Sequence, residues 1–498
     1  MKKTGQTKGY SHILKYTGLF GGVQGLNILV GMVRNKLVAT ILGPAGTGLI
    51  SLFNSTINLL SESTNLGISV SAVRNISEAY DNDRHDEMER IIRMVRSWCF
   101  VTALLGMALC VMLSPWLSDW TFGWGNHVLH FVLLSPVVGM LAITGGEMAI
   151  LKGLRRLRTL ALISVFNVVA ALVTSVPLYY YFGEKAIVPS LFIMGFTQMV
   201  LTIGYSYRLF PLRVSFGRGT LGEGMGMVRL GVALVLAGVL GSGADFLIKT
   251  YLSHHTSQEA VGLYSAGYMM VMAYASLVFS TMEADFFPRL SSSHRLATTT
   301  STVVNRQIEV SLLLISPLLV FFTIALPILL PLLYSNAYTP AIGMMQVMVL
   351  AMYFRAIKLP IAYLPLAKGD SYSYLLLEAI YDVLIVLAVI AAYNSWGLRG
   401  CGIAITAVSV VDFFILFFYT RYKYRYSMSA SVVRYTFMQL PFGILAFLVT
   451  LYCHGWLYWL AGVVLAGGSL AVSLAILRQK TSLWEALKAK WKRRTSHE

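Results

Sequence analysis

The sequence is poor in charged residues, and this scarcity excludes a soluble globular protein. Only 12% of its 498 residues are Asp, Glu, Lys or Arg, whereas soluble domains carry about 25%. Hydrophobic residues make up 56% of the chain, and the mean hydropathy is +0.68. This composition predicts an all-α polytopic membrane protein.

Cysteine is also scarce, and several catalytic signatures are missing. The four cysteines, Cys99, Cys110, Cys401 and Cys453, lie in or at the ends of apolar runs without CxxC spacing, which argues against a disulfide framework and a zinc site. The sequence has no Walker motif and no long external loop of the kind that membrane glycan polymerases and ligases use. We therefore expect no enzymatic activity, no bound metal and no cofactor, with H+ or Na+ as a candidate coupling ion.

Apolar runs long enough to cross a bilayer recur along the whole chain. About 20 residues at about 1.5 Å rise span the roughly 30 Å hydrocarbon core. Fourteen spans are predicted, at 18–42, 48–72, 94–114, 129–151, 160–182, 187–207, 228–250, 262–284, 308–333, 340–366, 373–393, 400–420, 432–453 and 456–477.

Positively charged residues are concentrated in alternate loops. With the N-terminus inside, the cytoplasmic loops and span ends hold 34 of the 39 Lys and Arg residues. Basic loops remain in the cytoplasm, so both termini are predicted to be cytoplasmic. The formal net charge of +17 is then explained by topology and by anionic membrane lipids, and nucleic acid is not expected as a partner.

Residues 18–78 are predicted to form two apolar helices joined by a five-residue turn, Gly43 to Thr47. At 100° per residue, one face of the first helix collects polar or small residues, and Lys36 points away from it. That face holds Gln24, Asn27, Gly31, Arg34 and Asn35. The second helix has a similar face, with Ser51, Asn54, Asn58, Ser61, Glu62, Asn65 and Ser69. Two such faces predict either a shared aqueous cavity or a polar seam between helices.

Arg34 is the strongest single candidate for a functional residue. An Arg at mid-membrane costs roughly 2.5 to 3.5 kcal/mol, and ionisable residues there are usually functional. We expect Arg34 to face a central cavity. Further candidate substrate contacts are Gln24, Asn27, Asn54, Asn58, Glu62 and Asn65. The alternative for the second helix is a seam held by Asn and Ser, which needs no substrate.

Charged residues of later spans are further candidates. Asp245 and Lys249 lie four residues apart in the seventh span, so they either line the site or neutralise each other. Arg355 and Lys358 lie toward the inner half of the tenth span. These two cations either take part in binding or extend to the inner membrane interface.

Three carboxylates follow in the next two spans. Glu378 and Asp382 are one turn apart on the eleventh span and could pair with the cations of the tenth, and Asp412 lies in the twelfth. All three are candidate coupling carboxylates. The tenth span also contains Pro360 and Pro365, which predict a broken or kinked helix.

Residues 262–291 resemble residues 48–77 at an offset of 214, with a Gly-Leu pair at the start of each. Six spans separate the copies. An even-numbered repeat is parallel, so the halves are predicted to be related by a pseudo-two-fold axis along the membrane normal. The expected domains are six-helix lobes at 1–210 and 211–425, then 426–498 with two extra helices and a basic interfacial tail.

Two segments resemble a known family of membrane transporters. ILGPAGTGLISLFNSTINLLSESTNLGISVSAVRNISEA resembles the first hairpin of bacterial O-antigen translocases, the polysaccharide-exporter branch of the multidrug/oligosaccharidyl-lipid/polysaccharide superfamily. EMAILKGLRRLRTLALISVFN is similar to that family's connection between the fourth and fifth spans. The resemblance implies a twelve-helix, two-lobed transporter that moves an undecaprenyl-pyrophosphate-linked oligosaccharide across the bacterial cytoplasmic membrane. The two extra C-terminal spans resemble the lipid II flippases, which have fourteen.

The expected function is therefore a lipid-linked oligosaccharide flippase that works by alternating access. Alternatives are a lipid II flippase, a drug/cation antiporter of the same superfamily, which would need carboxylates in place of Arg34, and a membrane polymerase or ligase. The expected partners are the substrate lipid and membrane lipids, with a polysaccharide polymerase as a further candidate. The transporter itself is expected to be monomeric.

Overall fold

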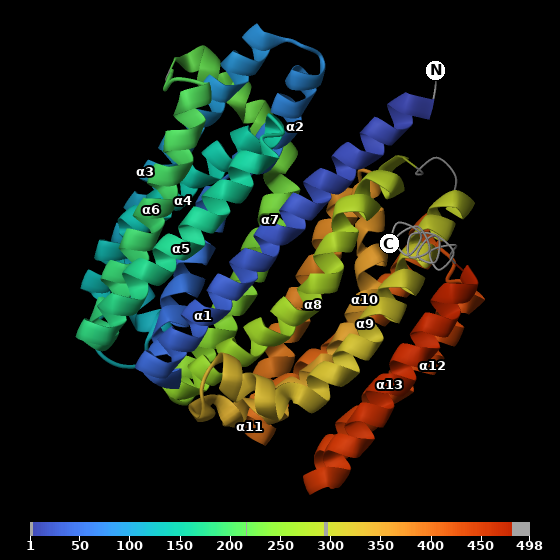
Figure 1. Ribbon diagram of the computed structural model, residues 1–498. Helices are drawn as coiled ribbons and strands as arrows, with labels where there is room; N and C mark the ends of the chain where they lie inside the picture. Colours follow the sequence, from blue (N-terminus) through green and yellow to red (C-terminus); the bar gives the residue numbers. More distant parts are fainter. Residues whose placement is uncertain (1–2, 216, 293–296, 481–498) are drawn as a thin grey trace, which may run out of the picture. The chain divides into compact units, whose positions relative to one another are not determined.

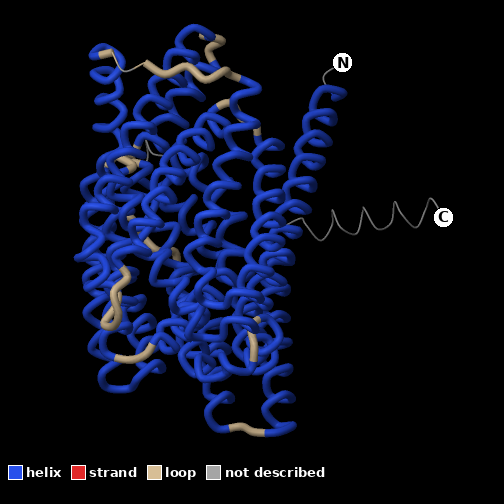
Figure 2. Tube along the Cα trace, turned by 90° about the vertical axis from the view of Figure 1, so that its left-hand side faces the viewer, coloured by secondary structure: helices blue, strands red, loops and turns tan. Residues whose placement is uncertain are grey.

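The computed structural model describes residues 3–215, 217–292 and 297–480 (Figure 1). These residues form helices joined by short loops, and no strand occurs among them (Figure 2). The helices are α1 (Lys3–Thr64), α2 (Ile68–Asp81), α3 (His85–Thr121), α4 (Val128–Gly153), α5 (Leu157–Phe182), η1 (Gly183–Ala186), α6 (Ile187–Leu209), α7 (Arg218–His255), α8 (Gln258–Ser292), α9 (Ala297–Leu333), η2 (Asn336–Ala341), α10 (Ile342–Ala367), α11 (Ser371–Tyr424), α12 (Ala430–Tyr452) and α13 (Gly455–Lys480). The predicted all-α class is confirmed. The expected interfacial tail lies outside the described residues.

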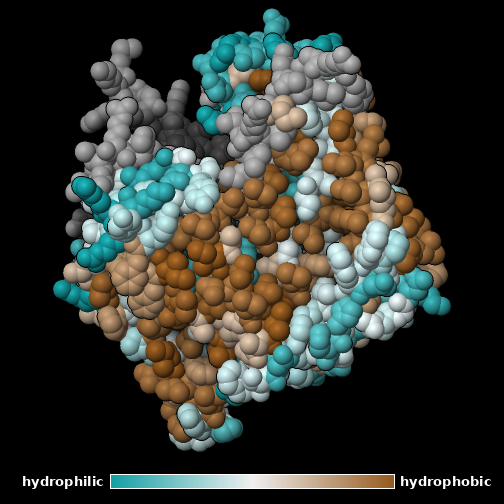
Figure 3. All heavy atoms as spheres, turned by 180° about the vertical axis from the view of Figure 1, so that it is seen from behind, coloured by the Kyte–Doolittle hydropathy of each residue, from teal (hydrophilic) through white to brown (hydrophobic). Residues whose placement is uncertain are grey.

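Ten helical stretches of the described chain are long and apolar enough to cross a membrane. Three of them, Leu26–Thr64, Arg158–Leu209 and Ser371–Tyr424, contain 39, 52 and 54 residues, whereas one crossing needs about 20. Arg158–Leu209 and Ser371–Tyr424 each contain two of the predicted spans, and Leu26–Thr64 overlaps the first two. Hydrophobic side chains cover most of the middle of the face seen in Figure 3, as expected for helices that contact lipid.

A single glycine divides α1 into two helical stretches. Gly43 has φ 64° and ψ −173°, and glycine adopts such a positive φ without a steric penalty. Helical structure resumes at Pro44, because proline fits the first position of a helix, where its missing N–H has no intrahelical acceptor. The predicted five-residue turn from Gly43 to Thr47 is therefore wrong, and the break is one residue long.

Two other helix boundaries differ from the prediction. The second predicted span extended to residue 72, but α1 ends at Thr64, and Gly67 with φ 70° precedes α2. In contrast, α10 continues through Pro360 and Pro365 to Ala367, so the tenth span is not broken there. A proline inside a helix removes one backbone hydrogen bond, which membrane helices tolerate where neighbouring groups compensate.

The chain forms two compact units. The first comprises residues 1–263 and 331–338, and the second comprises residues 264–330 and 339–498. In the first unit, α1 packs on α5 and α7, and α4 packs on α3 and α6. In the second unit, α10 packs on α11, and α12 packs on α13.

Helix boundaries recur at the predicted offset of 214 residues. α4 and α10 begin and end 214 residues apart, and so do the starts of α5 and α11. Gly183, which ends α5, has φ 57° and ψ −137°, and Gly397, which interrupts α11, has φ 60° and ψ −146°. These glycines are again 214 residues apart and share one conformation. The matches support a duplication, and superposition of the two halves remains a prediction.

The glycines of the two Gly-Leu pairs contact each other directly. A Cβ built at Gly48 would overlap the carbonyl oxygen of Gln258, and one built at Gly262 would overlap the carbonyl oxygen of Pro44. Each glycine thus meets the carbonyl of the residue four positions before the other. Such reciprocity is typical of a two-fold contact between similar segments, and only residues without a side chain allow the backbones to approach this closely.

Candidate functional site

Arg34 lies on α1 with its guanidinium group directed at α5 and α6. Its Nε donates a hydrogen bond to Ser175 Oγ at 3.0 Å, and its Nη2 lies 3.2 Å from Met194 Sδ. The side chain is half-buried, and none of the carboxylates in the described part of the chain forms an ion pair with it. The Ser175 hydroxyl and the Met194 thioether are both neutral, so they do not balance the positive charge of Arg34. Arg34 can therefore still accept an anionic ligand.

Buried polar atoms accompany Arg34 along the seam between α1, α5 and α6. Asn27 Nδ2 donates to Ser164 Oγ at 2.8 Å. Asn27 Oδ1 and Asn167 Oδ1 are buried without a hydrogen-bond partner in the described structure, a state that costs about 1–3 kcal/mol per group. These atoms could bond the hydroxyls of a polar ligand. Gln24 lies outside the side chains that the structure describes.

The polar face of the second stretch of α1 is directed at another helix. Glu62 faces α7, where a Cβ at Gly238 would lie 3.2 Å from Glu62 Oε2. Asn65 Oδ1 accepts a hydrogen bond from a serine one turn later at 3.3 Å, while Asn54 is half-buried and Asn58 is exposed. In the described contacts, the first polar face of α1 thus meets α5 and α6, and Glu62 of the second face meets α7.

Two lysines of the first unit, unlike Arg34, have partners that balance their charge. Lys249 Nζ lies 2.7 Å from Asp245 Oδ2, so these two predicted site residues neutralise each other within α7. Lys36 Nζ donates to the Pro331 carbonyl at 2.7 Å. That carbonyl lies in the last turn of α9, where carbonyls lack an intrahelical donor. Arg34 differs from both lysines because its charge is not matched by an acidic or helix-terminal group.

The second unit contains an ionic cluster on α10 and α11. Lys358 Nζ forms an ion pair with Asp412, and their side chains are 18% and 4% exposed. The same Nζ lies 4.0 Å above the centroid of the Tyr381 ring. Glu378 interacts electrostatically with Lys358, Asp412 and Arg355, and Asp382 interacts with Glu378, Lys358 and Asp412. The structure thus brings together all five predicted charged residues of this unit.

The offset of 214 relates this ionic cluster to the polar seam of the first unit. Glu378 corresponds to Ser164, Tyr381 to Asn167, and Asp412 to Gln198. Ser164 and Asn167 belong to the seam beside Asn27. The carboxylates of the cluster thus correspond to positions of α5 and α6, whereas Arg355 and Lys358 correspond to Leu141 and Thr144 of α4 and not to Arg34 of α1. The seam beside Arg34 contains neutral side chains, and the cluster contains three carboxylates and two cations.

A buried ion pair in the first unit was missed by the sequence analysis. Arg96 Nε and Nη2 donate to the two Glu147 oxygens at 2.8 and 3.2 Å, and both side chains are 3% exposed. Arg96 Nη1 also donates to the Pro211 carbonyl at 2.8 Å, and Ser206 Oγ donates to Glu147 at 2.5 Å. The sequence does contain a signal for this pair, because Glu147 is a carboxylate within the fourth apolar run and would need a buried partner. The full pairing of Arg96 indicates a structural role for this network.

Asp370 anchors the start of α11 outside the membrane-spanning stretches. Its carboxylate accepts hydrogen bonds from Ser373, Tyr424 and Lys423, the last at 2.7 Å. Burial alone would raise the pKa of Asp370, but these hydrogen bonds outweigh it and hold the pKa well below its usual range. Asp370 is therefore ionised and structural at neutral pH.

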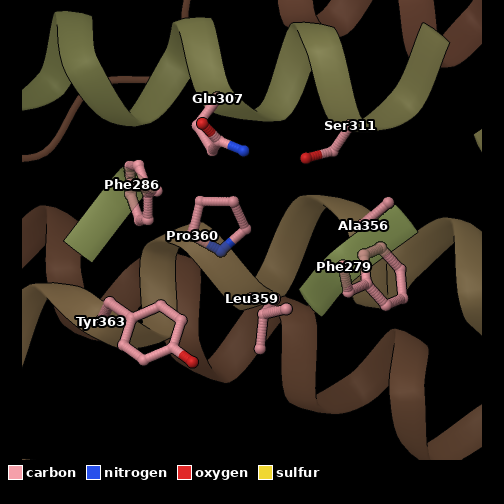
Figure 4. Close-up of a pocket in the computed structure, with 8 residues that line it drawn as sticks. All are labelled: Phe279, Phe286, Gln307, Ser311, Ala356, Leu359, Pro360 and Tyr363. Atoms are coloured by element: carbon pink, nitrogen blue, oxygen red, sulfur yellow. The ribbon is translucent and has the colours of Figure 1, made fainter. Parts of the chain in front are cut away.

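A small pocket in the second unit is too narrow for a sugar. Gln307 and Ser311 of α9 point toward Pro360 of α10, and Phe279 and Phe286 of α8 complete the wall (Figure 4). Its volume is about 10 Å³, roughly the space that one water molecule needs. The pocket therefore does not compete with Arg34 as a candidate substrate site.

The family of the chain follows from its sequence. Residues 13–294 match the family described as polysaccharide biosynthesis protein. This stretch covers more than half of the chain, and the protein belongs to that family. No curated protein matches the sequence.

Solved structures with the same fold are membrane transporters. The chain is similar to the lipid II flippase MurJ in an inward closed conformation, with TM-score 0.73 and 12% identity over 93% of this chain and 99% of that one. It is similar to an inward-facing multidrug resistance MATE family transporter of the MOP superfamily, with TM-score 0.66 and 16% identity over 81% and 94%. A MOP superfamily transporter from Pyrococcus furiosus Vc1, described as having a binding pocket of reverse polarity, matches with TM-score 0.58 and 14% identity over 82% and 93%. The protein is therefore a multi-pass membrane protein with the MOP transporter fold.

Proposed function

We propose that the protein is a flippase that moves an undecaprenyl-pyrophosphate-linked oligosaccharide, an O-antigen or related surface polysaccharide unit, to the outer leaflet of the bacterial cytoplasmic membrane. The observation that carries the proposal is Arg34, a membrane-embedded cation whose described partners are Ser175 and Met194. Membership of the polysaccharide biosynthesis family supports a glycan substrate.

The chemistry of the substrate matches this seam. A pyrophosphate group carries about two negative charges, and Arg can bond it with two parallel hydrogen bonds, which Lys cannot do. The unpaired amide oxygens of Asn27 and Asn167 can accept hydrogen bonds from sugar hydroxyls. The isoprenoid chain can remain in the lipid because it is as apolar as the bilayer interior.

The membrane potential favours transport in the outward direction. Moving one elementary charge through 100 mV changes the free energy by about 2.3 kcal/mol. For a headgroup of charge about −2 and an outside-positive potential, outward movement is favoured by about 4–5 kcal/mol. Transport then needs no ATP, in keeping with a sequence that has no Walker motif.

The ionic cluster of the second unit is the proposed site for a coupling ion. Glu378, Asp382 and Asp412 outnumber Arg355 and Lys358 by one charge when all five are ionised. An excess carboxylate in the membrane is costly, so one H+ or Na+ would balance the cluster. Occupancy of this cluster would then alternate with occupancy of the Arg34 seam during alternating access.

A drug/cation antiporter is less well supported. A cationic drug would be repelled by Arg34, which forms no ion pair with a described carboxylate, and the seam beside it contains amides and hydroxyls. For the Pyrococcus furiosus transporter, reversed polarity of the binding pocket likewise suggests a different function. A lipid II flippase remains the closest alternative in chemistry, because its substrate also carries a pyrophosphate.

A gene deletion tests this function. Loss of the protein should leave lipid-linked oligosaccharide in the inner leaflet and remove surface glycan, and the wild-type gene should restore export. Surface glycan is measured by immunoblot, and leaflet position by access of a sugar-binding lectin in intact and opened spheroplasts. Unchanged glycan, or arrest of peptidoglycan synthesis instead, would contradict the proposed substrate.

A further inference from the structure

An open groove lies between α5 and α6 near the C-terminal end of α6. It has a volume of about 290 Å³ and is lined by Phe166, Val200, Leu201, Gly204, Tyr205 and Arg208. Phe166 and Val200 are 50% and 48% exposed. The floor is open at Gly204, where an added Cβ would meet no atom within 4 Å. The groove is thus open to the surface of the first unit and has both apolar and polar lining residues.

The cationic side chain of Arg208 lies at one end of this groove. Arg208 lies in the last turn of α6 and is exposed. Its guanidinium carbon is 6.0 Å from the centroid of the Tyr205 ring, at the limit of a cation–π contact. No ion pair to Arg208 occurs among the described carboxylates. Its charge is therefore free to meet an anion at the groove mouth.

The second half of the repeat shows that the fold does not require this groove. At the offset of 214, Gly204 corresponds to Phe418, Arg208 to Tyr422 and Val200 to Phe414. Phe418 stacks on Phe414 with a centroid distance of 6.4 Å. The matching positions of the second unit thus carry aromatic rings where the first unit has a glycine and an arginine.

We propose that the α5–α6 groove binds an anionic phospholipid of the cytoplasmic leaflet, with an acyl chain against Gly204 and the phosphate at Arg208. The antiparallel packing of α5 on α6 places the start of α5, and the basic α4–α5 connection with Lys152, Arg155 and Arg156, at the same end. Basic pockets between helices on the cytoplasmic side attract anionic headgroups. The site is distinct from the Arg34 seam and does not depend on the transported substrate.

Native mass spectrometry of the purified full-length protein tests the site. The protein is given equal amounts of phosphatidylglycerol and phosphatidylcholine, and the bound ratio is measured. Wild type should retain phosphatidylglycerol preferentially. Arg208→Gln should lower that preference about fivefold, the effect expected for one cation near an anionic lipid. Gly204→Phe, which copies the second unit, should abolish retention by filling the groove.

Matched controls separate this site from general surface charge. Arg421→Gln removes an exposed arginine from the last turn of α11, and Gly467→Phe adds a ring at an exposed, open glycine of α13. Both should retain the wild-type ratio, and melting temperatures check that all four variants are folded. The proposal is overturned if Arg208→Gln and Gly204→Phe behave like wild type. It is also overturned if only Arg208→Gln matters, since no acyl chain would then occupy the groove.

Discussion

The Arg96–Glu147 pair offers a sharp test of how the first unit is held together. Glu147→Gln keeps the size of the side chain but removes its charge, and so leaves the Arg96 guanidinium buried without a counterion. Both side chains are 3% exposed and share two hydrogen bonds of 2.8 and 3.2 Å. Breaking such a buried pair from one side costs about 3–5 kcal/mol. We expect a loss of stability of this order.

Replacing both partners should be much less harmful than replacing one. In Arg96→Met/Glu147→Met, no charge remains to be desolvated, and well-packed apolar replacements of a buried pair are often neutral. The Arg96 bond to the Pro211 carbonyl is lost, at a cost of about 1 kcal/mol. The double variant should therefore be more stable than Glu147→Gln.

Thermal unfolding in detergent compares the stability of wild type, Glu147→Gln and the double variant. The control is Glu89→Gln, which breaks the Arg213–Glu89 pair, whose side chains are 62% and 48% exposed. Exposed pairs contribute about 0–1 kcal/mol. If Glu147→Gln destabilised the protein no more than Glu89→Gln does, the buried pair would not be the anchor that its geometry indicates.

Three other parts of the chain give further predictions. Gly48→Ala should reduce the yield of folded protein, because the added methyl group forces the backbone of Gln258 away at a cost of about 1–3 kcal/mol. Gly467→Ala is the control and should leave the yield unchanged. The two yields are compared by fluorescence-detected size-exclusion chromatography. Asp370→Asn should lower the melting temperature at pH 7, and the difference in melting temperature from wild type should shrink below about pH 4. A lowered native pKa stabilises the fold only while the carboxylate is ionised. A difference that stays constant with pH would contradict this. A reporter fused after Glu498 should be active only in the cytoplasm, and periplasmic activity would mean that the predicted number of spans is odd.

Hydropathy predicted most helices, because every segment that crosses lipid has to satisfy its backbone hydrogen bonds internally. A run of about 20 apolar residues has to form a helix to satisfy its backbone, and each long helix coincides with one or two predicted spans. The breaks were harder to place. The one-residue break at Gly43 depends on a positive φ followed by Pro44, and Gly-Pro segments are compatible with longer turns as well.

Polar partners were less predictable than polar positions. Periodicity placed Arg34 and Asn27 on one face of a helix, but their contacts with Ser175 and Ser164 depend on how α5 and α6 pack. Glu378 and Asp382 were candidate partners for Lys358, but its ion pair forms with Asp412. The distance between helices decides between the carboxylates, and the local sequence does not encode that distance.

The most direct test of the proposed function is export of surface glycan by Arg34 variants at equal protein levels. Hydrogen bonds to a charged group contribute about 1.5–3 kcal/mol, so Arg34→Ala should reduce export by roughly 10- to 150-fold. Arg34→Lys should restore only part of it, because Lys keeps the charge but loses bidentate geometry. Arg399→Ala, which removes an exposed arginine, is the control and should export normally. Full export by Arg34→Ala would contradict the role of Arg34 in holding the pyrophosphate.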